Sequence, residues 1–195
     1  MTDYTIRHKR TIVLTSEYAS APTIEAEYIG RGRYCEAYRN GRDVYLLSSE
    51  ADLGKEIACS LESMTHLPTC EYLGWVGDRR LYKMPYYRTV TASDKKAWAQ
   101  YERVLKAWQG ADRDINFSAR LDYDYGYGLL ITVRDALSGT SLGRAVGEIA
   151  DRCADYGASW TLEIAKRNCG VGQGGNLILR DCWFDPQEVA KGERA

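Results

Sequence analysis

Alternating apolar and polar positions dominate the first half of the chain. Short alternating runs bounded by turn residues predict β-strands, and they cover residues 11–14, 23–29, 36–38 and 43–47. The dipeptide Asn40-Gly41 separates the last two runs. Both of its residues tolerate positive φ, so it predicts a two-strand hairpin. Two further runs, at residues 70–76 and 80–84, are joined by the turn dipeptide Gly77-Asp78. We therefore expect an antiparallel sheet.

Apolar residues recur at helical spacing in two segments of this region and just beyond it. Ser49 is a candidate N-cap for a helix over residues 50–64. A second helix is predicted from Thr91 to Gly110, where the glycine closes it. His66, between these helices, is interpreted as a structural link and not as a base.

The second half of the chain is less regular. Residues 111–128 show no clear pattern, and the apolar run at residues 129–133 fits either a strand or a buried helix. Residues 141–166 predict one long helix or a helix pair with a break at Gly157. Two short strands are expected after it, at residues 176–179 and 182–184.

Length and composition place the chain among ordinary globular proteins. Its 195 residues suffice for one large domain or two tightly packed lobes, and 45% hydrophobic with 27% charged residues argues against disorder. The net charge of −1 gives no global attraction to nucleic acid or to an anionic membrane. Six scattered cysteines without zinc-ligand spacing indicate a reduced, cytoplasmic setting. No apolar stretch fits a signal peptide or a membrane span, so we expect neither secretion nor membrane insertion.

The order of these elements resembles that of a protein kinase. Residues 29–38, with the sequence IGRGRYCEAY, are similar to the glycine-rich loop of that family, with Gly30 and Gly32 at its first two glycines. The resemblance extends over about residues 22–188. It implies an α+β fold: an antiparallel N-lobe with one helix in residues 1–88 and a reduced, mainly helical C-lobe in residues 89–195, joined in one compact two-lobe unit.

Further residues carry the resemblance to a kinase site. Glu56 is similar to the helix C glutamate, and Met84 and Tyr86 lie where the fifth strand would enter the hinge. Asn176 and Asp185 resemble the two metal ligands of the catalytic loop and the DFG element. Together with Gly30 and Gly32, the residues Glu56, Met84 and Tyr86 are thus implied to form a nucleotide site, and Asn176 and Asp185 a metal site.

Two departures from the kinase pattern indicate lost catalysis. The third strand of a kinase ends in a lysine that grips the phosphates, whereas residues 44–49 contain no lysine. The catalytic aspartate belongs five residues before Asn176, and that position is Val171. Because valine cannot deprotonate a hydroxyl, we lean toward a protein without enzymatic activity. We expect a regulatory or inhibitory module that binds an unidentified protein and resembles small bacterial or phage kinase-like accessory proteins.

The expected nucleotide site is vestigial, at Gly30, Gly32, Glu56, Met84 and Tyr86. No cofactor is required, and ATP and Mg²⁺ bind weakly at most. Neither nucleic acid nor a membrane is an expected partner.

Two alternatives stay open at this point. The chain fits an active but atypical phosphotransferase or nucleotidyltransferase, which keeps Asn176 and Asp185 as metal ligands. Such an enzyme would recruit Arg31, Arg33 or Lys55 in place of the missing lysine. The chain also fits an unrelated α+β protein whose hairpin imitates a glycine-rich loop.

Overall fold

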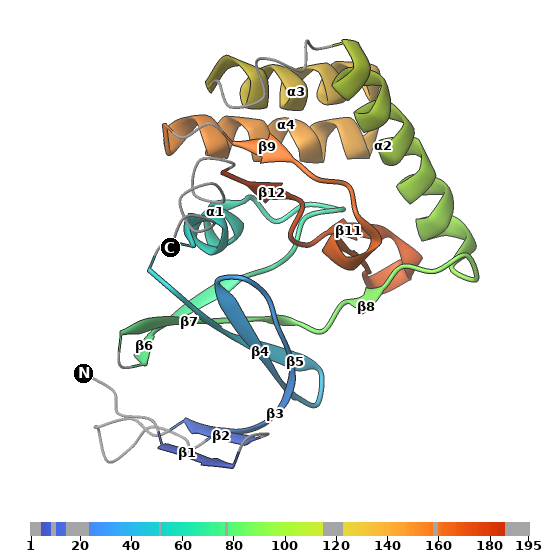
Figure 1. Ribbon diagram of the computed structural model, residues 1–195. Helices are drawn as coiled ribbons and strands as arrows, with labels where there is room; N and C mark the ends of the chain where they lie inside the picture. The colour runs from blue at the N-terminus through green and yellow to red at the C-terminus, as the bar shows by residue number, and fades with distance from the viewer. Residues whose placement is uncertain are drawn as a thin grey trace. The chain divides into compact units, whose positions relative to one another are not determined.

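The computed structural model describes most of the chain. The described residues are 5–8, 11–14, 24–50, 52–76, 78–114, 123–157 and 160–185. They form a mixed α+β protein, as the sequence predicted, and the chain divides into two compact units (Figure 1). The first unit comprises Met1–Cys59 and Thr69–Tyr86, and the second comprises Ser60–Pro68 and Tyr87–Ala195. The short segment Ser60–Pro68 therefore belongs with the C-terminal half of the chain.

The first unit is an antiparallel sheet with one helix. Its strand order is β1-β2-β3-β4-β5-β7-β6. The strands are β1 (Thr5–His8), β2 (Thr11–Leu14), β3 (Ile24–Arg31), β4 (Cys35–Asn40), β5 (Asp43–Ser48), β6 (Glu71–Val76) and β7 (Arg79–Pro85). The predicted hairpin is confirmed, because Asn40 pairs with Asp43 and Gly41 has a φ of 59°. Gly77 of the second predicted turn lies outside the described residues. Helix α1 (Leu53–Ser60) follows β5 and is shorter than the predicted helix over 50–64.

Strand pairing sorts the side chains of β5 and β7 onto two faces of the sheet. Directly paired residues point to the same side, and Ser48, Leu46 and Val44 pair with Arg80, Tyr82 and Met84, respectively. One buried cluster contains Val44, Leu46, Tyr82 and Met84, and Cys59 of α1 packs against it. The other cluster contains Ala26, Tyr38, Tyr45, Leu47 and Leu81. We call the first side, which α1 covers, the helix face.

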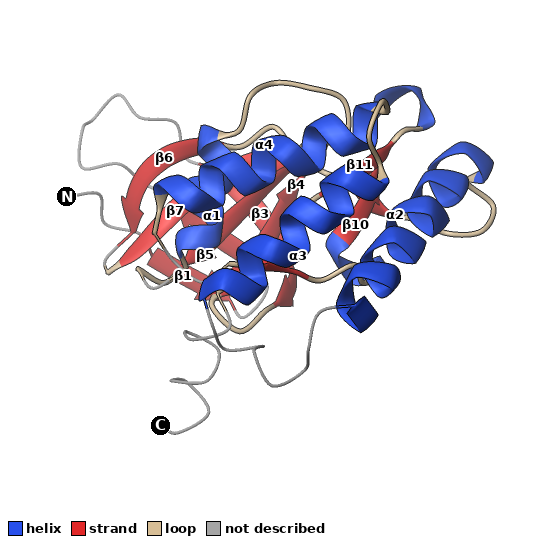
Figure 2. Cartoon of the chain, turned by 90° about the horizontal axis from the view of Figure 1, so that it is seen from above, coloured by secondary structure: helices blue, strands red, loops and turns tan. Residues whose placement is uncertain are grey.

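Three helices make up much of the second unit. They are α2 (Lys95–Asp114), α3 (Tyr123–Ala136) and α4 (Ser141–Asp155), and α3 and α4 lie side by side (Figure 2). The prediction that Gly110 ends a helix was wrong, because α2 continues to Asp114. A mid-helix glycine costs only about 1 kcal/mol, and the buried Ala111 beyond it packs in the core. None of the helices in the described part of the chain has the length and apolar character needed to cross a membrane.

The structure also settles the ambiguous runs of the second half. Residues 129–133 are part of α3 and are therefore a buried helix. Helix α4 ends at Asp155, and Gly157 follows with a φ of 63°, so the predicted break is confirmed. The helix does not resume after Gly157, which corrects the expectation for 141–166. Part of the unclear segment, residues 115–122, lies outside the described residues.

Two small sheets complete the second unit. One has the order β11-β10-β8 and the other pairs β12 with β9. Their strands are β8 (Arg88–Thr89), β9 (Thr161–Leu162), β10 (Cys169–Val171), β11 (Leu177–Leu179) and β12 (Trp183–Phe184). Gly170 allows the close contact of β10 with the chain before β8, since a Cβ there would lie 2.5 Å from the Cβ of Tyr87.

His66 ties the segment Ser60–Pro68 to the rest of the second unit. Its side chain is fully buried. Nδ1 donates to the carbonyl of Leu177 at 2.7 Å, so Nε2 of the neutral ring accepts from Oγ of Ser141 at 2.9 Å. Its own carbonyl accepts from the amide of Leu179 at 2.8 Å. Burial lowers the pKa of His66, which keeps the ring neutral and fits the interpretation of His66 as a structural link.

Replacing His66 with alanine should destabilise the second unit. The variant loses a buried ring and leaves buried polar atoms unpaired, so we expect the free energy of unfolding to fall by about 2–4 kcal/mol. Because the folded-state pKa lies below the ordinary 6.5, the contribution of His66 is fully present above that pH and declines as the pH falls. Denaturant unfolding at several pH values measures both effects. The exposed Thr65 supplies the control Thr65→Ala; equal stability of the two variants would contradict the assigned role.

Candidate functional site

Gly30 is the next-to-last residue of β3 and pairs with Ala37 of β4, and Gly32 lies in the turn that joins these strands. The amide of Gly32 donates to the carbonyl of Cys35 at 2.7 Å and closes this turn. Neither glycine adopts positive φ. A Cβ would meet no described atom within 4 Å at Gly30, and at Gly32 it would meet only the Cys35 carbonyl oxygen at 3.6 Å. The fold itself therefore requires glycine at neither position, and the space beside the turn is open.

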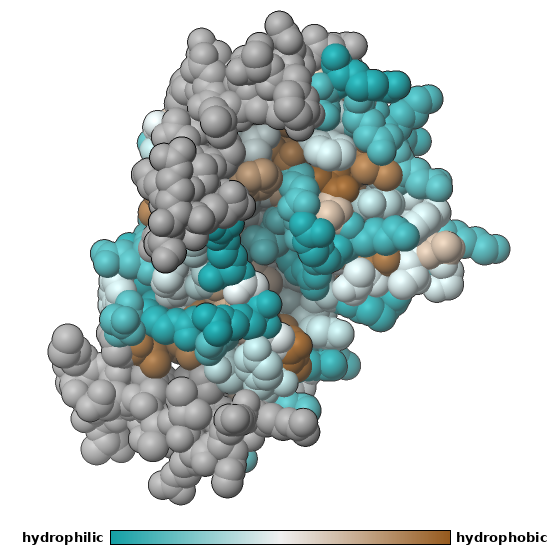
Figure 3. All heavy atoms as spheres, in the orientation of Figure 1, coloured by the Kyte–Doolittle hydropathy of each residue, from teal (hydrophilic) through white to brown (hydrophobic). Residues whose placement is uncertain are grey.

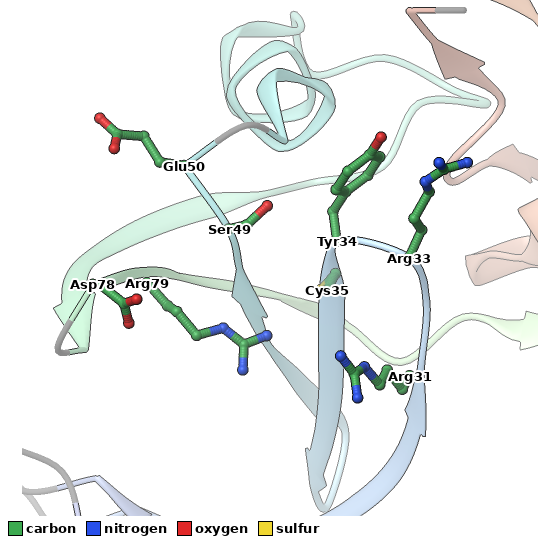
Figure 4. A pocket seen from close by; sticks show the side chains of 8 residues that line it. All are labelled: Arg31, Arg33, Tyr34, Cys35, Ser49, Glu50, Asp78 and Arg79. Carbon is green, nitrogen blue, oxygen red and sulfur yellow. The ribbon is translucent and has the colours of Figure 1, made fainter. Parts of the chain in front are cut away.

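A hollow of about 520 Å³ lies beside this turn within the first unit. Its lining consists of Arg31, Arg33, Tyr34, Cys35, Ser49, Glu50, Asp78 and Arg79 (Figure 4). Arg31 and Arg79 extend toward each other in Figure 4, whereas Arg33 and Tyr34 point away from them. Two of the cations that the sequence offered as substitutes for a lysine, Arg31 and Arg33, thus line one hollow, together with the acids Glu50 and Asp78.

Arg79 is already engaged at this hollow. Its guanidinium contacts the carboxylate of Glu36 at 3.0 Å and donates to the carbonyl of Leu47 at 2.6 Å. Burial raises the pKa of Glu36, but hydrogen bonds from Tyr38 and Arg79 outweigh it and hold that pKa below its ordinary value. Glu36 therefore stays ionised and neutralises Arg79, and the nearby charge of Arg31 also lowers the pKa of Glu36.

Glu56 has an unexpected partner on the helix face. It forms an ion pair with Arg80 of β7, while the helix-face positions of β5 are Val44, Leu46 and Ser48. The cation beside the helix glutamate thus comes from the neighbouring strand. The sequence reading missed Arg80, because only the register of β5 against β7 shows that Ser48 and Arg80 are neighbours.

The third substitute cation, Lys55, is committed to the interior of the first unit. Only 6% of the residue is exposed, and its Nζ lies 4.0 Å from the carboxylate of Asp52. The same carboxylate accepts a hydrogen bond from Oγ of Ser48. Lys55 therefore neutralises a partly buried acid, which makes it a poor source of charge for an external phosphate.

Met84 and Tyr86 take different environments. Met84 is buried in the helix-face cluster. Tyr86 is exposed, its amide donates to the carbonyl of Arg42 at 2.7 Å, and the guanidinium of Arg39 lies 3.9 Å from the centre of its ring. The role of Gly30, Gly32, Glu56, Met84 and Tyr86 as a nucleotide site stays a prediction.

Asn176 and Asp185 belong to different small sheets. Asn176 directly precedes β11, and its Oδ1 accepts from Nε2 of Gln100 at 3.4 Å. Its carbonyl accepts from the amide of Gly172 at 2.8 Å within the β10–β11 hairpin. Asp185 directly follows β12, which pairs with β9. Their joint role as metal ligands stays a prediction.

The structure groups three other oxygen-bearing residues of the second unit. Oε2 of Glu163 accepts from Nδ2 of Asn168 at 3.0 Å, and Oε1 accepts from Arg167. The amide of Asp181 donates to the carbonyl of Asn168 at 3.1 Å. Glu163 and Asn168 are half-buried and Asp181 is exposed. We call Glu163, Asn168 and Asp181 the carboxylate–amide group.

Two residues of this group have the spacing that a kinase catalytic loop has between its aspartate and its asparagine. Glu163 lies five residues before Asn168, as Val171 lies five residues before Asn176. This spacing could not be recognised from the sequence, because Glu163 falls within the helix predicted over residues 141–166. Carboxylate and amide oxygens suit Mg²⁺. Among the described residues, however, no three His, Cys, Asp or Glu side chains are placed to hold a metal, so a cation here would need the Asn168 oxygen and water as further ligands.

Comparison with known proteins gives no match to a protein-family model, a curated protein or a solved structure. The chemistry of the chain is therefore inferred from its own geometry.

The Glu56–Arg80 pair should contribute measurably to the stability of the first unit. Its side chains are 30% and 16% exposed, and we expect Arg80→Met to lower the free energy of unfolding by about 1–2 kcal/mol. The double variant with Glu56→Gln should recover part of this loss in a double-mutant cycle. Lys83→Met, also on β7, breaks the more exposed pair with Asp43 of β5; it serves as the control and should cost below about 1 kcal/mol. Strict additivity of the two changes would show that Arg80 and Glu56 are not coupled.

Proposed function

We propose that this chain is a catalytically impaired kinase-like protein that regulates another protein by binding it. Support comes from the order of elements in the first unit: β3, the turn with Gly30 and Gly32, β4, β5, α1, β6 and β7. These are the elements of a kinase N-lobe in the same chain order. The observation that carries the proposal is the ion pair of Glu56 with Arg80, because it places the helix glutamate beside a cation from a different strand.

The same ion pair is the reason to propose impaired catalysis. In kinases, one lysine both pairs with the helix glutamate and holds the nucleotide phosphates. Here Val44, Leu46 and Ser48 occupy the helix face of β5, and the half-buried Arg80 is engaged by Glu56. Loss of one preorganised electrostatic group commonly lowers kcat by about 10²- to 10³-fold. A chain that lacks the lysine is therefore better suited to binding than to phosphoryl transfer.

The second candidate function is a Mg²⁺-dependent phosphotransferase or nucleotidyltransferase. The carboxylate–amide group favours it, as do Arg31 and Arg33 at the hollow. Two hydrogen bonds weigh against it: the carboxylate oxygens of Glu163 already accept from Arg167 and Asn168. A carboxylate whose two oxygens are both engaged is poorly placed to take a proton from a substrate.

Nucleotide and metal titrations separate these two functions. We expect ATP with Mg²⁺ to shift the unfolding temperature of the wild type by less than about 1 °C and to yield no ADP above a protein-free control. An enzyme would instead be stabilised by both ligands together and would release ADP. Asp181→Asn and Asp185→Asn form the matched pair in that case, because loss of turnover in only one of them identifies the metal ligand. Turnover by the wild type would overturn the proposed impairment.

The edge strand β6 is the proposed protein-binding surface. On the face shown in Figure 3, hydrophilic residues cover much of the described surface, and hydrophobic residues are exposed in small groups. Among the described residues, six large hydrophobic side chains are exposed. Three of them, Tyr72, Leu73 and Trp75, belong to β6. Tyr72 packs on Tyr82 with ring centres 5.4 Å apart, so its ring is held in place. An apolar edge strand is a template for an added strand.

The charges at the ends of β6 indicate which segment would pair with it. Glu71 at the start of the strand and Asp78 just beyond its end are exposed acids. The arginine and lysine side chains of the adjacent β7 are engaged by Glu36, Glu56 and Asp43. The complementary occupant is an extended segment of another protein, with an apolar centre and basic residues at both ends.

A pair of synthetic peptides tests this surface. A fluorescent peptide with alternating valine and threonine between lysine ends should bind, and its acid-ended counterpart should not. Leu73→Lys places a charge on the edge and should weaken binding at least about tenfold, whereas Ile29→Lys, at an exposed position of β3, should leave it unchanged. Equal binding of both peptides would contradict the charge argument. A dimer in light scattering that Leu73→Lys dissociates would show that a second copy occupies the edge instead.

A further inference from the structure

Two cysteine thiols of the first unit, Cys59 and Cys70, face each other across the two ends of the segment 60–69. Cys59 is the penultimate residue of α1, and Cys70 directly precedes β6. Their Sγ atoms are 3.0 Å apart, and both residues are half-buried. We propose that Cys59 and Cys70 form a reversible modification site, which reacts with a small disulfide such as oxidised glutathione and closes to an intramolecular disulfide. This inference does not depend on the proposed function.

The geometry needs little movement to reach the oxidised form. A disulfide bond is about 2.05 Å long, so the two sulfur atoms must approach by about 1 Å. Both cysteines belong to the first unit, whereas the chain between them includes Ser60–Pro68 of the second unit. The bond would therefore link Cys59, the last residue of the first stretch of this unit, to Cys70, the second residue of its other stretch.

The surroundings of the two thiols give them different roles. The hydrogen-bond contact with Cys70 lowers the pKa of Cys59, and Lys55, one helical turn earlier, lowers it further, against opposing effects of burial and of Glu71. The contact with Cys59 and burial raise the pKa of Cys70. Cys59 is thus the more readily ionised thiol and the attacking group, since the thiolate is the nucleophile. Cys70 is the resolving thiol.

The reaction balances as two thiol–disulfide exchanges. The Cys59 thiolate attacks one sulfur of oxidised glutathione, its S–S bond breaks, and one glutathione thiolate leaves and takes up a proton. Cys70 then loses its proton to solvent and attacks the Cys59 sulfur, which expels the second glutathione thiolate. Two protein thiols are oxidised, and one glutathione disulfide is reduced to two thiols. A dithiol reductant reverses both steps.

The second unit contains an internal control for this reactivity. Cys169 and Cys182 also lie close together, with Sγ atoms 3.6 Å apart, but both are fully buried. Burial raises the pKa of Cys182, and an external disulfide cannot reach the sulfur atoms in the folded protein. Proximity is common to both pairs, so different reactivity would isolate the contributions of access and thiolate formation. Cys35, half-buried on the helix face, is the competing thiol to monitor.

Oxidised glutathione, added to the reduced full-length protein under native conditions, tests the proposal. After an acid quench, intact mass spectrometry should show loss of two hydrogen atoms, and peptide mapping should identify a Cys59–Cys70 bond. Cys70→Ser should trap one glutathionyl group on Cys59. Cys59→Ser should react at least about tenfold more slowly. Dithiothreitol should restore the wild-type mass.

Three results would overturn the proposal. The first is a wild-type protein that stays fully reduced in excess oxidised glutathione. The second is a bond that involves Cys35, or one between Cys169 and Cys182 that forms before the Cys59–Cys70 bond. The third is a Cys59→Ser variant that acquires glutathione on Cys70 as fast as the wild type reacts. The mapping of the wild-type protein decides the question even if a variant fails to fold.

Discussion

The packing of α1 against one face of the antiparallel sheet determines which side chains of the first unit are available for chemistry. Alternation along β5 and β7 turns Val44, Leu46, Tyr82 and Met84 toward the helix, where they lose contact with water. Burial of a polar side chain on that face costs free energy unless the side chain finds a partner. Arg80 finds Glu56, and Ser48 finds Asp52. A charge with a partner in the interior is not available to an external ligand, and our functional proposal follows from that constraint.

The groups that remain accessible lie elsewhere in the first unit. Arg31 and Arg33 line the hollow beside the β3–β4 turn, and β6 leaves apolar side chains exposed along a sheet edge. The two surfaces adjoin at Asp78, which lines the hollow and lies just beyond the end of β6. The Cys59–Cys70 pair adds a third element, because Cys70 immediately precedes β6. Oxidation there would restrain the chain next to the edge strand without consuming any group that either surface requires.

The second unit follows the same principle with different partners. His66 is fully buried and satisfied by Leu177 and Ser141, so it has a structural role. The carboxylate–amide group is closer to solvent, and its Asp181 is exposed. Glu163 is restrained by Arg167 and Asn168. The unit thus retains oxygen-bearing side chains, while both carboxylate oxygens of Glu163 are already engaged.

Local pattern in the sequence predicted strands β2 to β7 of the first unit but not β1, and it predicted the hairpin at Asn40-Gly41 and the α+β class, because side-chain alternation and turn conformation act between near neighbours. It also supplied Gly30, Gly32 and Glu56 as candidates. It could not identify Arg80 as the partner of Glu56, or the neighbourhood of Cys59 and Cys70, because strand register and helix packing set those contacts. The end of α2 and the grouping of Glu163 with Asn168 and Asp181 likewise followed from burial and long-range hydrogen bonds, which override local preference.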